Sequence, residues 1–340
     1  MQIKEILAQL INKNGVSGEE FKASEYAMNI LSEYLECHID SFGNVYGLDR
    51  NYDEKKKTIL LEAHIDEIGM IVTYITDSGF LKVSNCGGLD QRLLLAQQVD
   101  VICSDKVIKG VITSTPPHLE KDNSKAANTE DIFIDIGMSR EQAEKTVSLG
   151  DRVLISNQLC NLQGDVVTAH AIDDRSGVAA ILYALDILKK QSQKYNINVL
   201  FAVQEEIGER GAEIGIQNLN PDIALVVDVS FARVAGDNPE DCGKMSCGPM
   251  IGVAPSLSRQ ISEELKSTAI KMNIPYQIEV MNGKTGTDAD VIGISNGGIK
   301  VCTVSIPLKY MHTPVETINI KDIENTAKLI AQFCESEEDL

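Results

Sequence analysis

Two adjacent carboxylates, Glu205 and Glu206, follow an apolar run in the segment VQEEIGERGA. The preceding residues 196–202, NINVLFA, have the composition of a buried strand. Mutual repulsion and loss of hydration both oppose the placement of two carboxylates beside such a strand. A solvated strand end is the ordinary interpretation of an isolated pair, so other residues must decide whether this pair has a chemical role.

Further histidines and carboxylates stand where other predicted strands end or helices begin. They are His64 and Asp66, Asp173 and Asp174, Asp228, and His312. Taken singly, each has an ordinary interpretation, such as a hydrogen-bonded histidine, a helix N-cap or a strand-end turn. In open α/β sheets, however, sites form beyond the carboxyl ends of the strands. Imidazole and carboxylate groups gathered at that edge indicate a dinuclear divalent metal site.

The spacing within these pairs is suited to a division of roles. His64 and Asp66 are two residues apart, so on a strand their side chains share a face and Asp66 can orient the imidazole. Glu205 and Glu206 point in opposite directions if strand geometry persists. One glutamate can then hold a metal ion while the other reaches a bound water as general base, and the cations offset the repulsion.

Length and composition exclude several classes of protein. The 340 residues carry 31 basic and 50 acidic side chains, and the formal net charge of −19 disfavours nucleic-acid binding. The start, MQIKEILAQLINKNG, is an amphipathic helix pattern and not a signal peptide, and no apolar run is long enough for a membrane span. Eight scattered cysteines without a CxxC pattern predict free thiols and a cytoplasmic protein.

The order of predicted elements indicates an α/β domain that is interrupted by a β-rich insertion. Residues 1–67 and 168–340 alternate strands with helices, which predicts one sheet covered by helices on both faces. Residues 68–167 contain short strands at close spacing, with one helical stretch at 139–148, and predict a small β-barrel or sandwich. Both flanks of the insertion are needed to complete the core of the α/β domain.

Individual elements are also predicted. The chain opens with two helices, and the second begins at Ser17, where Glu20 stands at capping-box spacing. Strands follow at 37–48 and 57–66. Beyond the insertion, helices are expected at 175–191, near 210–219, at 258–273, near 288–296 and at 321–338. The strands between them are expected at 196–204, 224–230, 276–281 and 299–307.

Nine short motifs carry a resemblance to one family of enzymes. They are GVSGEE (15–20), AHIDEIG (63–69), GGLDQR (87–92), PPHL (116–119), AIDDRSG (171–177), VQEEIGERGA (203–212), VVDVS (226–230), GTDAD (286–290) and IPLKYMHTPVE (306–316). With them the sequence resembles the dinuclear metallo-aminopeptidases of the glutamyl and tetrahedral aminopeptidase family. It departs from relatives at AHAIDDR, IPLKY and LLAQQV (94–99), and these departures bear on substrate preference.

The resemblance implies a zinc-peptidase-like mixed sheet flanked by helices, an inserted β-barrel domain, and two divalent ions per subunit. The ions would be zinc or cobalt, with manganese as a further option. The implied ligands are His64, Asp173, Glu206, Asp228 and His312. Asp173 would bridge the ions, His64 and Asp228 would complete one site, and Glu206 and His312 the other. Glu205 would be the general base and Asp66 would support His64.

The implied activity is the release of N-terminal residues from short peptides with a free N-terminus. Acidic and aliphatic N-terminal residues both remain open as the preferred group. Arg175, Arg233 and Lys309 are basic candidates near the site, whereas the negative net charge opposes the approach of acidic peptides. The resemblance also implies a homo-oligomer that forms through the inserted domain from dimers, up to a hollow dodecamer.

Three other functions compete with this one. A metal-dependent deacylase of small N-acyl compounds needs a similar centre, and a free-amine peptide tested against its N-acetylated form separates the two. A glycosidase, the label carried by some relatives as endoglucanases, needs carboxyl groups that are not tied to metals, and the chain has no tryptophan for sugar stacking. A non-catalytic metal-binding scaffold has no need of Glu205. His38, His118 and His170 are not expected to be ligands.

Overall fold

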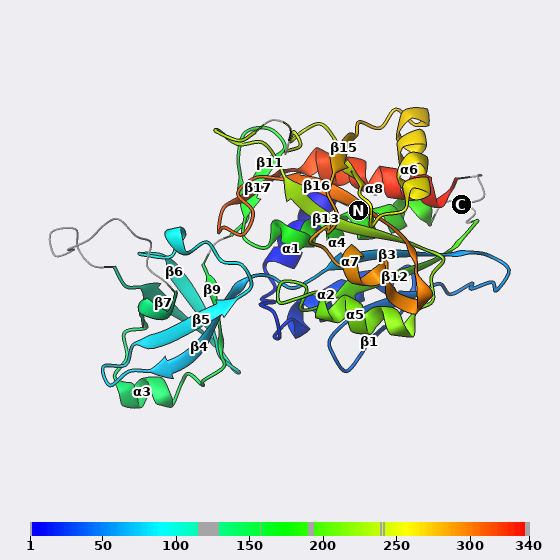
Figure 1. The fold of residues 1–340 in the computed structure, drawn as a ribbon. Helices are drawn as coiled ribbons and strands as arrows, with labels where there is room; N and C mark the ends of the chain where they lie inside the picture. Colours follow the sequence, from blue (N-terminus) through cyan, green and yellow to red (C-terminus); the bar gives the residue numbers. More distant parts are fainter. Residues whose placement is uncertain are drawn as a thin grey trace.

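The protein has two parts, an α/β part and a small barrel that extends from it (Figure 1). The computed structural model describes residues 2–114, 129–156, 158–189, 194–238, 240 and 242–336. The predicted α/β fold with an inserted β-barrel is confirmed. The PPHL motif, and with it His118, lies outside the described residues.

The α/β part is built on a mixed eight-stranded sheet in the order β1-β2-β12-β3-β13-β16-β14-β15. The strands are β1 (Glu36–Ile39), β2 (Val45–Leu48), β3 (Thr58–His64), β12 (Asn196–Ala202), β13 (Ile223–Phe231), β14 (Met250–Val253), β15 (Gln277–Val280) and β16 (Lys300–Leu308). The four central strands β12, β3, β13 and β16 run parallel, so their carboxyl ends meet at one edge. β2 and β14 join this centre antiparallel.

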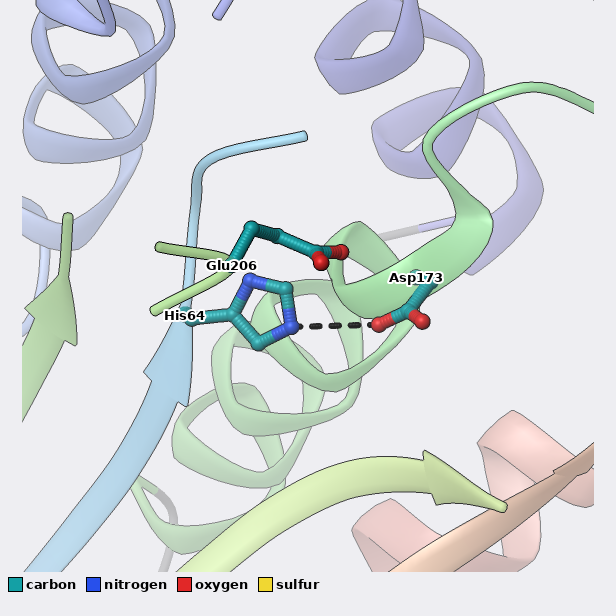
Figure 2. Close-up of side chains that lie close together, drawn as sticks. All are labelled: His64, Asp173 and Glu206. Carbon is teal, nitrogen blue, oxygen red and sulfur yellow. Dashed lines mark hydrogen bonds and ion pairs between the residues drawn. The ribbon is translucent and has the colours of Figure 1, made fainter. Parts of the chain in front are cut away.

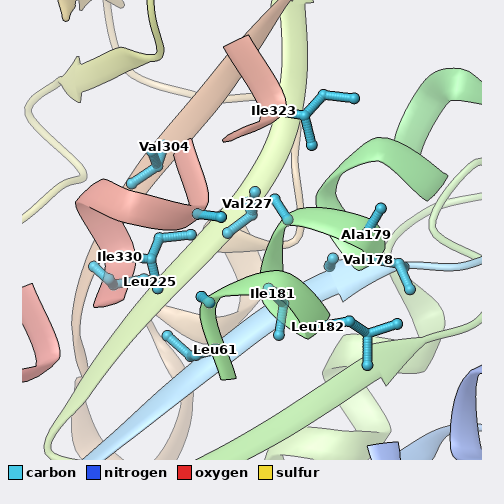
Figure 3. Packing of buried hydrophobic residues seen from close by; sticks show 14 of the residues in the cluster. Leu61, Val178, Ala179, Ile181, Leu182, Leu225, Val227, Val304, Ile323 and Ile330 are labelled. Carbon is cyan, nitrogen blue, oxygen red and sulfur yellow. The ribbon is translucent and has the colours of Figure 1, made fainter. Parts of the chain in front are cut away.

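Helices cover both faces of the sheet because alternate side chains of each strand point to opposite sides. Leu61 and Leu225 pack into the core on one face, under α1 (Ile3–Ile11), α2 (Phe21–Leu31), α4 (Ile172–Leu188), α6 (Arg259–Lys271) and α8 (Ile320–Cys334) (Figure 3). Their neighbours Leu60 and Ala224 point to the other face, where α5 (Arg210–Gly215) and α7 (Ala289–Ile292) pack. Full burial of each large apolar side chain contributes about 1.5–3 kcal/mol.

The barrel is closed by strands that all lie between residues 69 and 155. They are β4 (Gly69–Ile75), β5 (Leu81–Cys86), β6 (Gln98–Ile102), β7 (Val107–Ile112), β8 (Ile134–Asp135) and β9 (Arg152–Ile155), with α3 (Arg140–Glu144) beside them. The barrel has an apolar core of its own, which includes Met70, Val83 and Val101. The prediction of a small barrel is therefore confirmed.

A separate three-stranded sheet follows the barrel. It contains β10 (Cys160–Asn161), β11 (Val166–Ala169) and β17 (Glu316–Asn319). Because β11 pairs with β17, which leads into α8, this segment is joined to the α/β part by hydrogen bonds. The domain boundaries at 67 and 168 stay a prediction.

Several predicted helix boundaries were wrong. The second helix begins at Phe21 and not at Ser17, because the Ser17 hydroxyl donates to Asp66 at 2.6 Å and Glu20 accepts from the N–H of Gly18. A capping box forms instead at Ser139. The helix expected near 210–219 is instead α5 followed by a 3-10 turn at 216–218. The helix expected near 288–296 is instead the short helix α7 followed by a 3-10 turn at 295–297. Other 3-10 turns lie at 91–93 and 129–131.

The cysteines and the helices bear on two expectations from composition, free thiols and the lack of a membrane span, within the described residues. All eight cysteines lie in this part of the chain, and each is a free thiol there. Within the same residues, no helix has the length and apolar character that a membrane crossing needs.

Candidate metal centre

The sheet delivers the candidate ligands to one place. His64 is the last residue of β3, Glu206 follows β12, and Asp228 lies near the carboxyl end of β13. Asp173 stands in the first turn of α4, and His312 lies on the loop between β16 and β17. Because the central strands are parallel, their ends and the loops that follow share one edge, as expected for an α/β site.

His64, Asp173 and Glu206 form a compact group of possible ligands (Figure 2). One ligand atom from each lies within 4.8 Å of the others. Nε2 of His64 is 3.1 Å from Oδ1 of Asp173. Histidine nitrogen and carboxylate oxygen at this separation are able to share a divalent ion after small adjustments.

His312 also lies close to the carboxylates of Asp173 and Glu206. Its Nε2 lies 3.4 Å from Oδ2 of Asp173 and 3.4 Å from Oε1 of Glu206. The two oxygens of Asp173 therefore face two different imidazoles, Oδ1 towards His64 and Oδ2 towards His312. Nδ1 of His312 is 3.1 Å from the carbonyl oxygen of Gly88, which orients the ring.

A second group of possible ligands adjoins the first. It contains His64, Asp174 and Asp228, again with ligand atoms within 4.8 Å of one another, and Asp228 lies 3.9 Å from Nε2 of His64. Asp174 was interpreted from sequence as a helix cap, and its Oδ1 does accept from the N–H of Gly177 at 3.0 Å. Its Oδ2 is buried without a hydrogen-bond partner among the described residues. Asp174 was thus expected at this edge of the sheet, but it was not among the five ligands that the resemblance implied.

Asp66 supports two parts of the centre. Its Oδ1 lies 3.4 Å from Nδ1 of His64, as expected for a carboxylate that orients the imidazole. The same carboxylate accepts hydrogen bonds from the backbone N–H groups of Glu205 at 3.0 Å and of Glu206 at 3.2 Å. Asp66 is fully buried, and the hydroxyl of Ser17 donates to it. The adjacent glutamates are thus anchored through their backbone.

Glu316 has the same kind of role on the other side of the centre, and sequence reasoning missed it. Its carboxylate is buried and accepts from the backbone N–H of Asp173 at 3.1 Å and of His312 at 3.0 Å. It lies in the motif that contains His312, but its contacts are to backbone atoms, which leave no signal in residue spacing. Glu316 ties the loop of His312 to the start of α4.

Burial disfavours the ionised form of the carboxyl groups in this centre. Burial raises the pKa of Asp228 well above its usual value, and burial also raises the pKa of Glu206. Burial raises the pKa of Glu205 to about 9. Burial would lower the pKa of His312, but its contacts with Asp173 and Glu206 raise it to about 11. Divalent cations would stabilise the ionised carboxylates and replace these protons, so the residues present fit a metal centre.

Other candidates from the sequence lie away from the centre or have different roles. Arg175 was expected near the substrate, but it is fully buried and is bound to the carboxylate of Glu67 at 2.9 Å. Burial in that ion pair makes it a structural residue. His38 stacks on Tyr46 at a ring distance of 4.7 Å, and His170 binds Glu67, so neither belongs to the groups of possible ligands.

The sequence of this chain was compared with models of protein families. The family model of the M42 glutamyl aminopeptidases matches residues 43–329, which include all five proposed ligands. The chain belongs to the M42 glutamyl aminopeptidase family. Membership makes the protein a peptide hydrolase with a metal-dependent aminopeptidase centre, and the resemblance stated from the motifs is confirmed. The match spans the inserted barrel and every strand of the eight-stranded sheet except β1.

Two similar proteins are described as aminopeptidases. The chain is 36% identical over 329 residues to a putative aminopeptidase of Acetivibrio thermocellus. The aligned region covers 94% of each of the two chains. The chain is also 30% identical over 338 residues to a lysyl aminopeptidase of Pyrococcus furiosus, which covers 97% of this chain and 96% of the relative. Family membership therefore does not fix the preferred N-terminal residue.

Two solved structures of similar aminopeptidases share the fold over nearly the full length. An aminopeptidase from the archaeon Desulfurococcus kamchatkensis superposes with a TM-score of 0.92 at 33% identity, with 98% of this chain and 94% of that chain covered. The TET1 peptidase of Pyrococcus horikoshii superposes with a TM-score of 0.86 at 32% identity, with 98% and 99% covered. The latter protein is described as able to assemble into a tetrahedron or a large octahedral shell.

Proposed function

We propose that the protein is a dinuclear metal-dependent aminopeptidase that releases N-terminal residues from short peptides. The observation that carries the proposal is the position of Asp173, whose two oxygens face His64 and His312 separately. A carboxylate placed in this way is suited to bridge two cations. The family membership supports the aminopeptidase reaction, and the ligand geometry supports the paired centre.

The proposed ligands divide between two ions that share Asp173. His64 and Asp228 would hold one ion, and Glu206 and His312 the other. Zinc or cobalt suits this mixture of imidazole and carboxylate, and manganese is also compatible. When bound, the ions would supply Lewis acidity, which polarises a carbonyl and lowers the pKa of a coordinated water.

Glu205 is the proposed general base. It is next to Glu206 but is absent from both groups of possible ligands, so its carboxylate remains available for proton transfer. Nearby cations lower the pKa of a carboxylate, and Glu205 would therefore be ionised in the metal-loaded enzyme. It would take a proton from water and then deliver it to the leaving amine. Asp66 holds the Glu205 backbone in place for this task.

The proposed substrates carry a free α-amine. A carboxylate or a cation of the centre that binds the α-amine would leave no room for an upstream residue. The preferred side chain stays open between acidic and aliphatic groups, because the family name and the lysyl relative point to different preferences. Lys309 and Arg233 are partly buried, and they remain the basic candidates for an acidic substrate.

The proposed enzyme is a homo-oligomer of the cytoplasm. The likeness to TET1 peptidases that assemble into a dodecamer, a tetrahedron or an octahedral shell supports a homo-oligomer. We propose that it is built from dimers, up to a dodecamer, and that the barrel is the contact region. The free thiols fit a cytoplasmic location, because reducing conditions keep cysteines unpaired.

Two assays separate this function from its rivals. Purified protein loaded with zinc, cobalt or manganese should hydrolyse alanyl, leucyl or glutamyl p-nitroanilides and leave their N-acetylated forms intact. Preferential cleavage of the acetylated compounds would establish the deacylase instead. Release of reducing sugar from a β-glucan would support a glycosidase, and inactivity towards every substrate at full metal loading would leave a metal-binding scaffold.

A further inference from the structure

A small cavity lies beside the candidate ligand His312. It is bounded on one side by barrel residues of β9 and the loop after β5, and on the other by residues that flank β17 and α4. The lining includes Leu89, Leu154, Ile155, Ala171 and Pro314, so most of its wall is apolar. Because His312 also lines it, a group in this cavity would be next to the metal centre.

The cavity is narrow. Its volume is about 30 Å³, which is room for about two or three water molecules. A methyl group fits in a space of this size, whereas a leucine or lysine side chain needs several times more. Size therefore selects among substrates without any charged contact.

One polar side chain, His170, is held rigidly in the cavity wall. Its Nδ1 lies 2.6 Å from Oε2 of Glu67, and Oε1 of Glu67 accepts from Arg175 at 2.9 Å. An ionised carboxylate only accepts hydrogen bonds, so Nδ1 carries the proton and Nε2 is left for another partner. His170 is 16% exposed, while Glu67 and Arg175 are almost fully covered.

The charge of the lining disfavours an acidic side chain. Glu67 and Glu316 both line the cavity, and each is already engaged by donors of the protein. Arg175 offers no exposed donor, because the protein covers it completely and its guanidinium binds backbone carbonyls and Glu67. A substrate carboxylate would lose hydration here without gaining a cationic partner.

We propose that this cavity is a subsite for a small uncharged side chain next to the scissile bond, with His170 as its polar contact. The inference rests on the proposed aminopeptidase function and deepens it by naming the substrate class. Alanyl and seryl residues would fit, and leucyl, lysyl and glutamyl residues would be excluded by size or charge. Leu89 would set the size limit, since it is a partly buried side chain in the wall.

The first test uses two series of dipeptides, X-Ala and Ala-X, in which X is Ala, Leu, Lys or Glu. With the metal-loaded enzyme, kcat/KM at one of the two positions should be at least tenfold higher for Ala than for Leu, and lowest for Glu. Leu89→Ala should raise the Leu value relative to Ala by about tenfold at that same position. The control Leu95→Ala, an exposed leucine six residues along, should leave the ratio unchanged.

The second test addresses His170. His170→Ala should raise KM at that position about tenfold or more and lower kcat less, as expected for a lost ground-state contact. His38→Ala, which removes an exposed histidine, should change neither constant.

The outcomes separate the inference from the proposed function. Turnover of Ala and Leu peptides with equal kcat/KM at both positions, or an unchanged ratio in Leu89→Ala, would overturn the subsite. An unchanged KM in His170→Ala would remove His170 from it. Failure of the loaded enzyme to cleave any free-amine peptide would overturn the proposed function and the subsite together.

Discussion

Oδ1 of Asp66 accepts a hydrogen bond from the backbone N–H of Glu205 at 3.0 Å. The residue that is two positions after His64 therefore also fixes the backbone of Glu205, the proposed general base. The neighbouring N–H of Glu206 is held by the other oxygen of the same carboxylate, at 3.2 Å. The strand β12 ends at Ala202, so these two hydrogen bonds, and not strand pairing, hold the backbone of the glutamates. Of the two glutamates, only Glu206 belongs to a group of possible ligands.

The first prediction follows from this arrangement. Glu205→Gln should keep both metal ions and lose about 10²–10⁴ in kcat, because a glutamine cannot accept the proton. Glu206→Gln should lose metal affinity, because it replaces a charged ligand by a neutral one. Elemental analysis and steady-state kinetics with an alanyl p-nitroanilide check both, and Glu213→Gln on the exposed side of α5 serves as control. Equal metal loss in both variants would show that the roles are not divided in this way.

A second prediction concerns Glu316. Glu316→Gln keeps one carbonyl oxygen but places an amide donor against a backbone N–H, either of Asp173 or of His312. The dissociation constant for zinc should rise about 10–100-fold, as for other groups that orient metal ligands. Competition with a chelating dye measures it, and the exposed Glu263→Gln is the control. An unchanged constant would mean that Glu316 does not position the ligands.

A third prediction concerns the pH dependence of stability through Glu20. Burial, and then the charge of Asp66, raise the pKa of Glu20 to about 7. Because the folded-state pKa is raised, the stabilisation from Glu20 is full below about pH 4.5 and is lost as the pH rises through about 7. Glu20→Gln cannot ionise and should not lose this stabilisation, which amounts to about 3 kcal/mol at most.

Urea unfolding in the presence of chelator at pH 5 and pH 8 tests this. The free energy of unfolding of the natural protein should fall more between these pH values than that of Glu20→Gln. Parallel changes in both proteins would show that Glu20 keeps an ordinary pKa in the folded state.

A fourth prediction concerns the barrel, which we propose as the assembly domain. Replacement of residues 69–156 by a short glycine-serine linker leaves β11 paired with β17. The product should remain folded by circular dichroism and have a smaller mass than the natural protein by light scattering. An oligomer with the same number of subunits would place the contacts in the α/β part instead.

The sheet and the candidate ligands were predictable because they depend on local patterns. Apolar runs such as that of β3 and β12 mark buried strands, and His64 and Glu206 lie at or just after their ends. Parallel pairing then brings these ends together without further information. The fold class could be derived on this basis, whereas the family and the individual ligand roles came from the resemblance of the nine motifs.

The remaining features depend on contacts between distant residues. Ser17 was expected to cap a helix, but it donates to Asp66, 49 residues away, so the helix begins at Phe21. Arg175 was expected near the substrate, but its guanidinium is enclosed by Glu67 and by backbone carbonyls of the opening segment. Such burial is decided by packing in three dimensions and leaves no periodic signal in the sequence.

The number of metal ions per chain tests the central claim most directly. After chelation and reloading with zinc or cobalt, elemental analysis and peptidase activity should be measured on the same samples. The account predicts two ions per chain at saturation, no activity in the chelated protein, and recovery on reloading. Full activity with one ion per chain or none would contradict the dinuclear centre around Asp173.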